Sequence, residues 1–323
     1  MWTSVTVIFL TALSSVTCSN TTIWHDFQKF MHKYEKMYDS IVHLEKRFEV
    51  FSDNVKFIEE ENLKNHPYKL GVNIFSDLTQ EEFQSYNKLE APKKRTNCGS
   101  FQNSEKEAPV NFDWRDHHAV TPIKNQGQCG SCWAFSATGA IEGAWYISND
   151  KLISLSEQEL VDCSTSYGNH GCNGGIMDYA FDFVIDNGIC SESSYSYEAK
   201  SETCKKCDEV VSLSSCSDVK PNDQNELLQA VLQNPVSVAI EADTRVFQSY
   251  KEGILSDTSC GTNLDHGVLI VGYGESDGEL YWLVKNSWGT SWGMDGYIKI
   301  KRTTSDNDAG ICGIAMMPSF PIV

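Results

Sequence analysis

The feature that most constrains the fold is the segment "CGSCWAFSATGAIEGAW", residues 129–145. From Ser131 to Trp145 the residues are almost all apolar or small, which predicts a helix that is buried within the protein. Such a helix needs other elements packed around it. Cys132 opens the apolar run, whereas Cys129 lies outside it.

The C-terminal part predicts a sheet. About ninety residues at the end of the chain contain four strand-like runs, each bounded by Gly, Asp or Asn: "PVSVAIEA", "HGVLIVGYG", "LYWLVKNSW" and "GYIKIKR". A further helix is predicted at 176–187. A helical half followed by a sheet-rich half predicts an α+β domain with a cleft between the halves.

The N-terminal part has a different character. Residues 23–62 show helical periodicity in two stretches, and two amphipathic helices of this kind need a partner for their apolar faces. Thr79 can cap a further helix, with Glu82 three residues on. Residues 86–107 are polar, lack periodicity and contain Lys-Lys-Arg at 93–95, which predicts a linker and a cut site. Of the 44 acidic residues 29 lie after this linker, against 13 of the 26 basic ones, so two electrostatically different parts meet near residue 107.

Residues 1–18 predict a signal peptide, because an uncharged stretch from Val5 to Leu13 is followed by small residues and is too short to span a bilayer. A buried N-terminal strand is the alternative. With twelve cysteines, a signal peptide predicts disulfides and the secretory pathway, ending in a lysosome-like acidic vesicle or outside the cell. No later stretch is apolar enough to span a membrane. The formal charge of −18 argues against nucleic acid or an anionic membrane as a partner.

The pair Cys129 and Cys132 has three interpretations. A redox pair of the thioredoxin kind needs a βαβ context, and "TPIKNQGQ" before it is not a strand. A zinc site needs two more soft ligands, which Cys204 and Cys207 could supply if disulfides did not compete for them. A nucleophile needs an imidazole beside it, a group that orients the imidazole, and oxyanion donors. Cys132 suits the third interpretation, because a helix N-terminus favours a thiolate.

His266 is the best candidate base among the eight histidines. It begins a strongly apolar strand, where an unused polar side chain would be costly. Asn286 ends another such strand twenty residues later. A cysteine at a helix start, a histidine at a strand start and an asparagine at a strand end together predict nucleophilic catalysis.

The segments "QGQCGSCWAFS", "LDHGVLIVGYG" and "KNSWGTSWG" resemble the papain family of cysteine peptidases, in particular its cathepsin L-like branch. The resemblance implies a papain-like fold of two subdomains, with a helical left half, a β-barrel-like right half and the cleft between them. It also implies a helical inhibitory propeptide before the peptidase domain. The implied domains are a signal peptide at 1–18, the propeptide at 19–107 and the peptidase domain at 108–323.

The resemblance implies a role for each catalytic position. Cys132 matches the nucleophile, His266 the general base and acid, and Asn286 the residue that orients the imidazole. Gln126 matches the side-chain donor of the oxyanion hole, acting with the backbone N–H of Cys132. Trp288 matches the indole that shields the Asn–His hydrogen bond from water. Cys129 is then a disulfide cysteine.

The resemblance also implies the substrate-binding residues. Gly174 and Gly175 match glycines whose backbone pairs with an extended substrate, which a missing side chain allows. The pocket for the substrate residue two before the scissile bond, called P2 here, is apolar in its implied lining: Ile176, Met177, Ala239, Leu264 and Met317. Asp265 is placed with the substrate-binding residues. This lining predicts a preference for bulky apolar P2 residues.

The N-terminal part resembles the inhibitory segments of these zymogens. The matching helical positions are Arg47, Phe51, Asn54, Ile58 and Asn62, and "GVNIFSD" fits a G-x-N-x-F-x-D motif. The family has glutamate where this chain has His43, which should weaken a local helix contact without abolishing the fold. The segment is expected to run backwards through the cleft and to leave it on acidification.

Disulfide pairing is implied by the resemblance alone: Cys129–Cys172, Cys163–Cys204 and Cys260–Cys312. Among Cys190, Cys207 and Cys216, one more bridge can form, which leaves one thiol. Cys207 in place of Cys204 is an alternative partner for Cys163, because connectivity does not follow from sequence.

These observations predict a cysteine endopeptidase that is made as an inactive zymogen and needs no metal or organic cofactor. Its expected partners are protein and peptide substrates and its own propeptide, and the expected state is a monomer. Two alternatives are a non-catalytic binding homologue, which usually loses the nucleophile or base, and an exopeptidase, which would need a cleft-blocking insertion near 190–220.

Overall fold

The computed structural model describes residues 21–89, 96–102 and 107–323. The predicted signal peptide, 1–18, and the Lys-Lys-Arg cluster lie outside the described residues. Within the described part of the chain, no helix combines the length and apolarity needed to cross a membrane.

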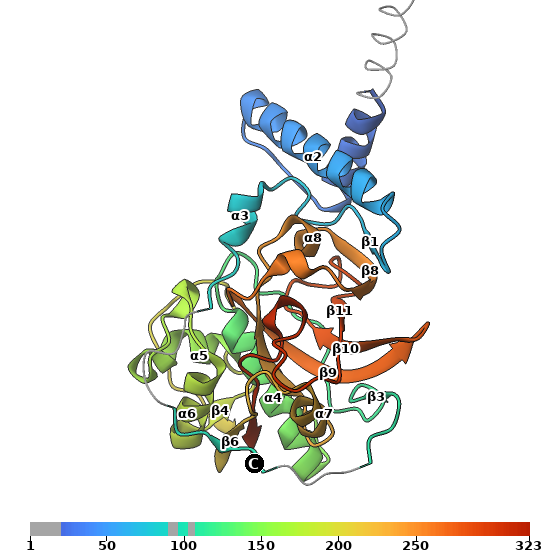
Figure 1. Cartoon of the computed structure of the whole chain (residues 1–323). Coiled ribbons are helices and arrows are strands. Elements are labelled where there is room, and N and C mark those ends of the chain that lie inside the picture. The colour runs from blue at the N-terminus through green and yellow to red at the C-terminus, as the bar shows by residue number, and fades with distance from the viewer. Residues whose placement is uncertain (1–20, 90–95, 103–106) are drawn as a thin grey trace, which may run out of the picture.

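The N-terminal part contains the two predicted amphipathic helices, residues 21–33 and α2 (Ile41–Asn62). Ser40 caps α2 by accepting a hydrogen bond from the backbone N–H of His43. The two helices pack through aromatic rings, with Phe27 and Phe51 fully buried and their centroids 5.2 Å apart. Figure 1 shows α2 above the peptidase part, at one end of the molecule.

The motif side chains of α2 hold the chain that follows it. Asn54 donates hydrogen bonds to the carbonyls of Ser76 and Leu78, both 3.0 Å. Asn62 exchanges two hydrogen bonds with the backbone of Leu70, the last residue of strand β1 (Tyr68–Leu70). The short helix α3 (Gln80–Gln84) begins with the capping box that the sequence predicts at Thr79.

His43 stands where the family has glutamate, and it still contacts the helical motif through Arg47. The guanidinium of Arg47 donates to Nε2 of His43 at 3.2 Å and forms an ion pair of 2.5 Å with Glu82. The ring of His43 also lies 2.8 Å from the carboxylate of Asp39. The substitution therefore leaves the arginine placed against α3.

The helical half of the peptidase surrounds the predicted buried helix, α4 (Cys132–Asn149), which is buried from Cys132 through Ala144. The neighbouring helices are α5 (Glu157–Cys163) and α6 (Met177–Asn187). A Cβ on Gly139 would lie 2.8 Å from Leu269 of the sheet, so a residue without a side chain is needed where α4 meets it. The remaining helices lie in the sheet half or are single turns: α7 (Gln224–Val231), α8 (Arg245–Gln248), η1 (Ser164–Tyr167), η2 (Gly171–Asn173), η3 (Thr258–Cys260) and η4 (Ile311–Gly313).

The sheet half is a ten-stranded mixed sheet whose main order is β1-β8-β11-β10-β9-β7-β12-β6-β2, with β3 pairing β9. This order runs from one edge to another, so the sheet described is not a closed barrel, although a barrel-like half was expected. The four predicted strand runs become β7, β9, β10 and β11. The bounds are β2 (Gly99–Ser100), β3 (Phe112–Asp113), β6 (Ser215–Asp218), β7 (Val236–Ile240), β8 (Tyr250–Leu255), β9 (His266–Ser276), β10 (Glu279–Lys285), β11 (Tyr297–Lys301) and β12 (Ser319–Ile322). A separate two-stranded sheet joins β4 (Ile189–Cys190) and β5 (Glu209–Val211).

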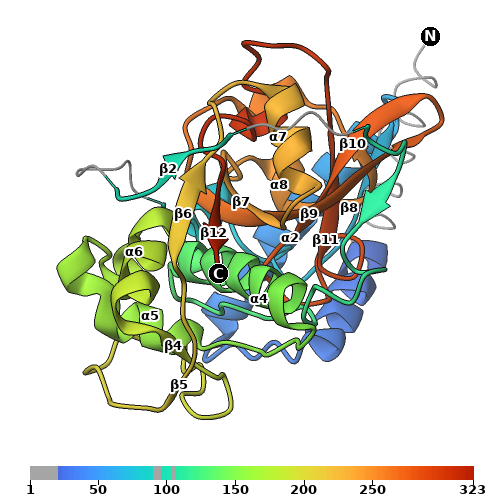
Figure 2. The same cartoon turned by 90° about the horizontal axis from the view of Figure 1, so that it is seen from below.

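The N-terminal part joins this sheet directly. Strand β1 pairs antiparallel with β8 at the sheet edge, with Tyr68 opposite Gly253. Pairing at an edge uses backbone groups that would otherwise be open. Figure 2 shows α4 passing beneath the sheet, with β6 and β12 beside it. The helical and sheet halves thus meet along α4 and β9.

The structure contains the three disulfides that the resemblance implies: Cys129–Cys172, Cys163–Cys204 and Cys260–Cys312. Two further bridges are present, Cys190–Cys207 and Cys98–Cys216. The expectation that one of Cys190, Cys207 and Cys216 keeps a free thiol was therefore wrong, because it left out Cys98 of the N-terminal part. Among the described residues Cys132 is the free cysteine.

Replacing Cys129 by alanine should lower the free energy of unfolding by about 2–5 kcal/mol, because the 43-residue loop to Cys172 is no longer closed. Cys132→Ala is the matched control and should unfold close to the parent, since it breaks no bridge. Urea unfolding of the three precursors measures the difference. Equal stability of Cys129→Ala and the parent would contradict the assigned roles of the two cysteines.

Candidate active site

Cys132 is the first residue of α4, and the first turn of α4 lies against the start of β9. The hydroxyl of Ser136 donates to the carbonyl of Val268 at 2.7 Å. A Cβ on Gly267 would lie 3.3 Å from the carbonyl oxygen of Cys132, so the two chains pass at backbone distance. This approach brings Cys132 next to the strand that His266 begins.

His266 is held in one orientation. One ring nitrogen, Nε2, lies 2.8 Å from Oδ1 of Asn286, and the imidazole stacks on Trp288 with centroids 4.6 Å apart. The other nitrogen, Nδ1, has no hydrogen-bond partner among the described residues. An amide oxygen at Nε2 stabilises the tautomer or cation that carries a proton there, which leaves Nδ1 for proton exchange with a thiol.

Both reactive groups are fully buried, and burial favours their neutral forms. Burial raises the pKa of the Cys132 thiol to about 11, although the backbone N–H groups of Gly267 and Lys88 offset part of the effect. Burial lowers the pKa of His266 to about 4, against the opposing hydrogen bond to Asn286. In this covered state the pair is a thiol and a neutral imidazole, not the ion pair that attacks a substrate.

The cover over Cys132 is the segment that follows α3, residues 86–89, of which Tyr86 lies in a turn and Leu89 in an isolated β-bridge; it is called the inhibitory strand below. The backbone N–H of Leu89 donates to the carbonyl of Asp265 at 2.9 Å, and Leu89 forms a parallel bridge with Gly175. A Cβ on Gly130 would lie 2.7 Å from the Cβ of Lys88, so the strand lies directly over the loop before Cys132. The strand is thus held on both sides of the cleft.

The side chain of Gln126, the predicted oxyanion donor, is held by hydrogen bonds on both sides of its amide. Its Oε1 accepts a hydrogen bond of 2.6 Å from the hydroxyl of Ser287, which points the amide nitrogen away from Ser287. That nitrogen donates to the carbonyls of Cys129, at 3.0 Å, and Tyr86, at 3.1 Å. In the covered state the predicted oxyanion donor is therefore bound to the inhibitory strand.

Four of the five predicted P2 residues, all but Ile176, belong to or pack against one large apolar cluster. Ile176, Met177 and Ala239 are buried, and Leu264 and Met317 are partly buried. Leu89 packs against the same apolar cluster that contains Met177 and Ala239 and against which Leu264 and Met317 pack. Burial raises the pKa of Asp265, next to Leu264, to about 7.

Trp288 links the site to the N-terminal part. It is buried beside His266, and Phe75 and Phe83 contact it edge-on with ring centroids 5.4 and 5.3 Å away. Phe75 belongs to the motif "GVNIFSD", whose Asn73 donates to the carbonyl of Gln248 at 2.7 Å. The N-terminal part therefore binds the peptidase through the same indole that covers the Asn–His hydrogen bond.

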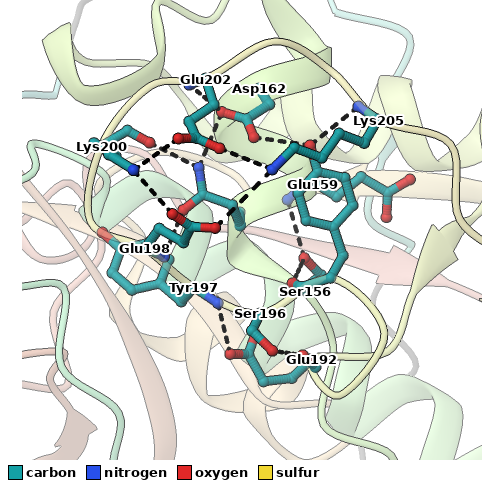
Figure 3. A network of polar contacts seen from close by, with 12 residues as sticks. Ser156, Glu159, Asp162, Glu192, Ser196, Tyr197, Glu198, Lys200, Glu202 and Lys205 are labelled. Atoms are coloured by element: carbon teal, nitrogen blue, oxygen red, sulfur yellow. Dashed lines mark hydrogen bonds and ion pairs between the residues drawn. The ribbon is translucent and has the colours of Figure 1, made fainter.

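A charged loop supports the segment that carries Gln126. Figure 3 shows Lys200 and Lys205 bridging the carboxylates of Glu198 and Glu202, and these ion pairs are exposed. From this loop the hydroxyl of Tyr197 donates to the carbonyl of Gln126 at 2.8 Å and lies 2.6 Å from the hydroxyl of Ser131. The exposed ion pairs are individually weak, so the partly buried Tyr197 supplies the firmer support.

Two clusters of ligand-type side chains lie elsewhere in the described residues: Cys98, Asp178 and Asp218, and Glu159, Cys190 and Cys207. In both clusters every cysteine is in a disulfide, so no thiolate is available to a metal.

The sequence did not identify the residues that cover the site. Residues 86–89 were expected to be linker because they lack periodicity. A segment that is bound in a cleft does not need a periodic sequence pattern. Leu89, the one apolar residue among polar neighbours, was the available signal. Ser287 and Tyr197, which hold Gln126, gave no signal of their own.

A buried thiol, a histidine oriented by an amide, and a covering strand that reaches from separate helices define the precursor of a cysteine peptidase. Residues 108–322 match the model of the papain family cysteine proteases, and residues 27–83 match that of the cathepsin propeptide inhibitor domain. The chain belongs to the papain family and is a cysteine-type endopeptidase preceded by an inhibitory propeptide.

Known relatives agree with this membership. The chain is 46% identical to thiol protease SEN102 of Hemerocallis over 318 residues, which cover 94% of this chain and 87% of the relative. It is 48% identical to cysteine proteinase RD21A of Arabidopsis thaliana over 299 residues, 90% of this chain but only 64% of that protein's length. The solved structure of digestive procathepsin L 3 from the Tenebrio molitor larval midgut has a TM-score of 0.87 and 41% identity, over 93% of this chain and 99% of that one.

At pH 7 iodoacetamide should alkylate Cys132 in the intact precursor at least about 100-fold more slowly than in the enzyme freed of its propeptide, because the covered thiol has a pKa of about 11. Timed labelling followed by peptide mass mapping measures both rates. Cys132→Ala, which should take up no label at this position, is the control. Equal rates would show that the propeptide does not suppress the thiolate.

Proposed function

We propose that Cys132, His266, Asn286 and Gln126 carry out peptide hydrolysis in the uncovered cleft. The thiolate of Cys132 attacks the peptide carbonyl, and the oxyanion is bound by the amide of Gln126 and the backbone N–H of Cys132. His266 gives its proton to the leaving amine, and water then hydrolyses the acyl-enzyme. The observation that carries this proposal is the His266–Asn286 hydrogen bond of 2.8 Å at the start of β9, the strand that packs against α4.

We propose that the precursor follows the secretory pathway, with residues 1–18 as its signal peptide, and acts as a monomer in an acidic vesicle or outside the cell. Residues 19–107 form the inhibitory part, and a cut within residues 86–107 separates it from the peptidase domain, 108–323. The substrates are proteins and peptides that enter the cleft in extended form beside Gly174 and Gly175.

Acidification is proposed to release the inhibitory part, and Glu82 gives the sign. Burial alone would raise the pKa of Glu82, but its hydrogen bonds with Arg47 and the backbone of Thr79 outweigh burial and lower the pKa. Its stabilising contribution is present above its ordinary pKa and is lost as the pH falls, so lower pH weakens the folded inhibitory part.

The precursor should be inactive at neutral pH and should gain peptidase activity on acidification, with a new N-terminus between residue 86 and Ala108. Activity assays and N-terminal sequencing along a pH series measure this. A start within residues 23–80 or beyond Trp114 would rule out the proposed boundary.

Cys132→Ala is the matched control for activation. Processed by added parent enzyme, it should have the same N-terminus and no turnover. Retained hydrolysis by Cys132→Ala would exclude Cys132 as the nucleophile.

The proposed P2 pocket favours apolar side chains. Ile176, Met177, Ala239, Leu264 and Met317 offer no carboxylate, and Leu89 of the inhibitory strand packs against the apolar cluster that contains Met177 and Ala239. An arginine would either enter with an unpaired charge or bend outward to solvent and lose contact. Replacing Met317 by glutamate would supply the counter-charge that an arginine at P2 lacks.

Substrates with Phe or Leu at P2 should exceed Arg counterparts in kcat/KM by about 10- to 150-fold, because burying such a side chain contributes about 1.5–3 kcal/mol. Met317→Glu should narrow this ratio, whereas Met317→Leu, the uncharged control, should preserve it. Equal kcat/KM for Phe and Arg substrates in the parent would contradict the assignment of the P2 pocket.

A further inference from the structure

Residues 96–102 precede the peptidase domain in sequence but are built into it in space. Cys98 forms a disulfide with Cys216, and β2 pairs in parallel with β6, placing Gly99 opposite Ser217 and Ser100 opposite Asp218. Figure 2 shows β2 beside β6 and, beyond it, β12. The segment thus extends the sheet by one strand at the edge opposite to β1.

The other contacts of this segment also go to the peptidase. The backbone N–H of Phe101 donates to the carbonyl of Asp218 at 2.8 Å, and its ring meets that of Phe320 edge-on at 5.5 Å. Phe101 is only 8% exposed. The backbone N–H of Asn97 donates to the carboxylate of Asp182 at 3.3 Å. These contacts are independent of α2 and α3.

We propose that residues 97–102 stay in the mature enzyme, anchored by Cys98–Cys216, and position the segment that carries Met317. The cut that frees the inhibitory helices then falls before Asn97, which narrows the boundary predicted from the sequence. A further cut after Gln102 would leave the peptide attached through the disulfide. The positioning role rests on the proposed P2 function of Met317, whereas the retention does not.

The strand order connects this segment to Met317. β6 pairs antiparallel with β12, with Ser217 opposite Phe320, and the backbone N–H of Val219 donates to the carbonyl of Pro318 at 2.9 Å. Phe101 and Met317 line the same cavity, of about 730 Å³. Removing the phenyl ring would unpack Phe320 and loosen the chain that leads into β12 from Met317.

Protonation of the carboxyl groups around residues 96–102 favours the packed state, whereas protonation of Glu82 in α3 weakens the inhibitory part. Burial raises the pKa of Asp178 to about 7 and, less strongly, those of Asp182 and Asp218. Lys220 and Glu226 line the adjoining cavity, and residues 96–102 carry no charged side chain. Raised carboxyl pKa values mean that protonation favours this packed state, so acid that releases α2 and α3 does not release residues 97–102.

Intact mass spectrometry of the acid-matured enzyme, alkylated without reduction, tests the retention. The mass should include residues 97–102, and Cys216 should take up label only after reduction. The Cys98→Ser/Cys216→Ser double variant is the control for the bridge. A non-reduced enzyme that lacks residues 97–102, or that has Cys216 alkylated, would overturn the proposal. If acid alone does not mature the precursor, limited tryptic digestion gives the same readout.

The positioning role is tested by Phe101→Ala, which keeps the bridge. The ratio of kcat/KM for Phe over Arg at P2 should fall about threefold or more, with no matching loss of kcat for the Phe substrate. Gln102→Ala, an exposed neighbour, should keep the parent ratio. An unchanged ratio in Phe101→Ala would overturn the positioning role.

If Phe101→Ala does not fold, the Cys98→Ser/Cys216→Ser variant is expected to show the same fall in the ratio. A ratio equal to that of the parent in this variant would count against the proposal. A parent without P2 preference would instead refute the pocket assignment and leave the mass test valid.

Discussion

The contact between the start of α4 and the start of β9 is the interaction on which the site depends. It places Gly267, the residue after His266, at backbone distance from Cys132, and Ser136 fixes the two elements by its hydrogen bond to Val268. A helix N-terminus favours a thiolate, yet the same close packing buries the thiol once a strand lies over it. The fold therefore keeps the thiol and the imidazole neutral while they are covered, and the proposed activity requires that they be uncovered.

The inhibitory part uses the peptidase's own binding groups. Its strand bridges Gly175, its Tyr86 carbonyl takes the amide of Gln126, and its aromatic rings pack on Trp288. At the far edge of the sheet, β1 adds to β8 as an extra strand. Inhibition thus requires no separate regulatory surface, and the helices serve to hold residues 86–89 in place.

The elements predicted best were those with periodic patterns. The apolar run from Ser131 gave α4, the runs around His266 and Asn286 gave β9 and β10, and Thr79 gave the cap of α3. Residues 86–89 and β2 were expected to be linker, because segments that are held by another part of the chain have no periodic sequence pattern. Cys98 shows the same limit, because a disulfide partner depends on distance in space. The change in charge near residue 107 marks a difference in composition, whereas the packing of the peptidase begins earlier, at Asn97.

The most direct test of this account is the pKa of the His266 imidazole, measured by NMR with labelled histidine in the precursor and in the matured enzyme. The account predicts a pKa of about 4 in the precursor, where the ring is buried and uncharged. It predicts a value at least about two pH units higher in the matured enzyme, where the thiolate of Cys132 can stabilise the imidazolium. The same pKa in both forms would contradict the claim that covering the site neutralises the catalytic pair.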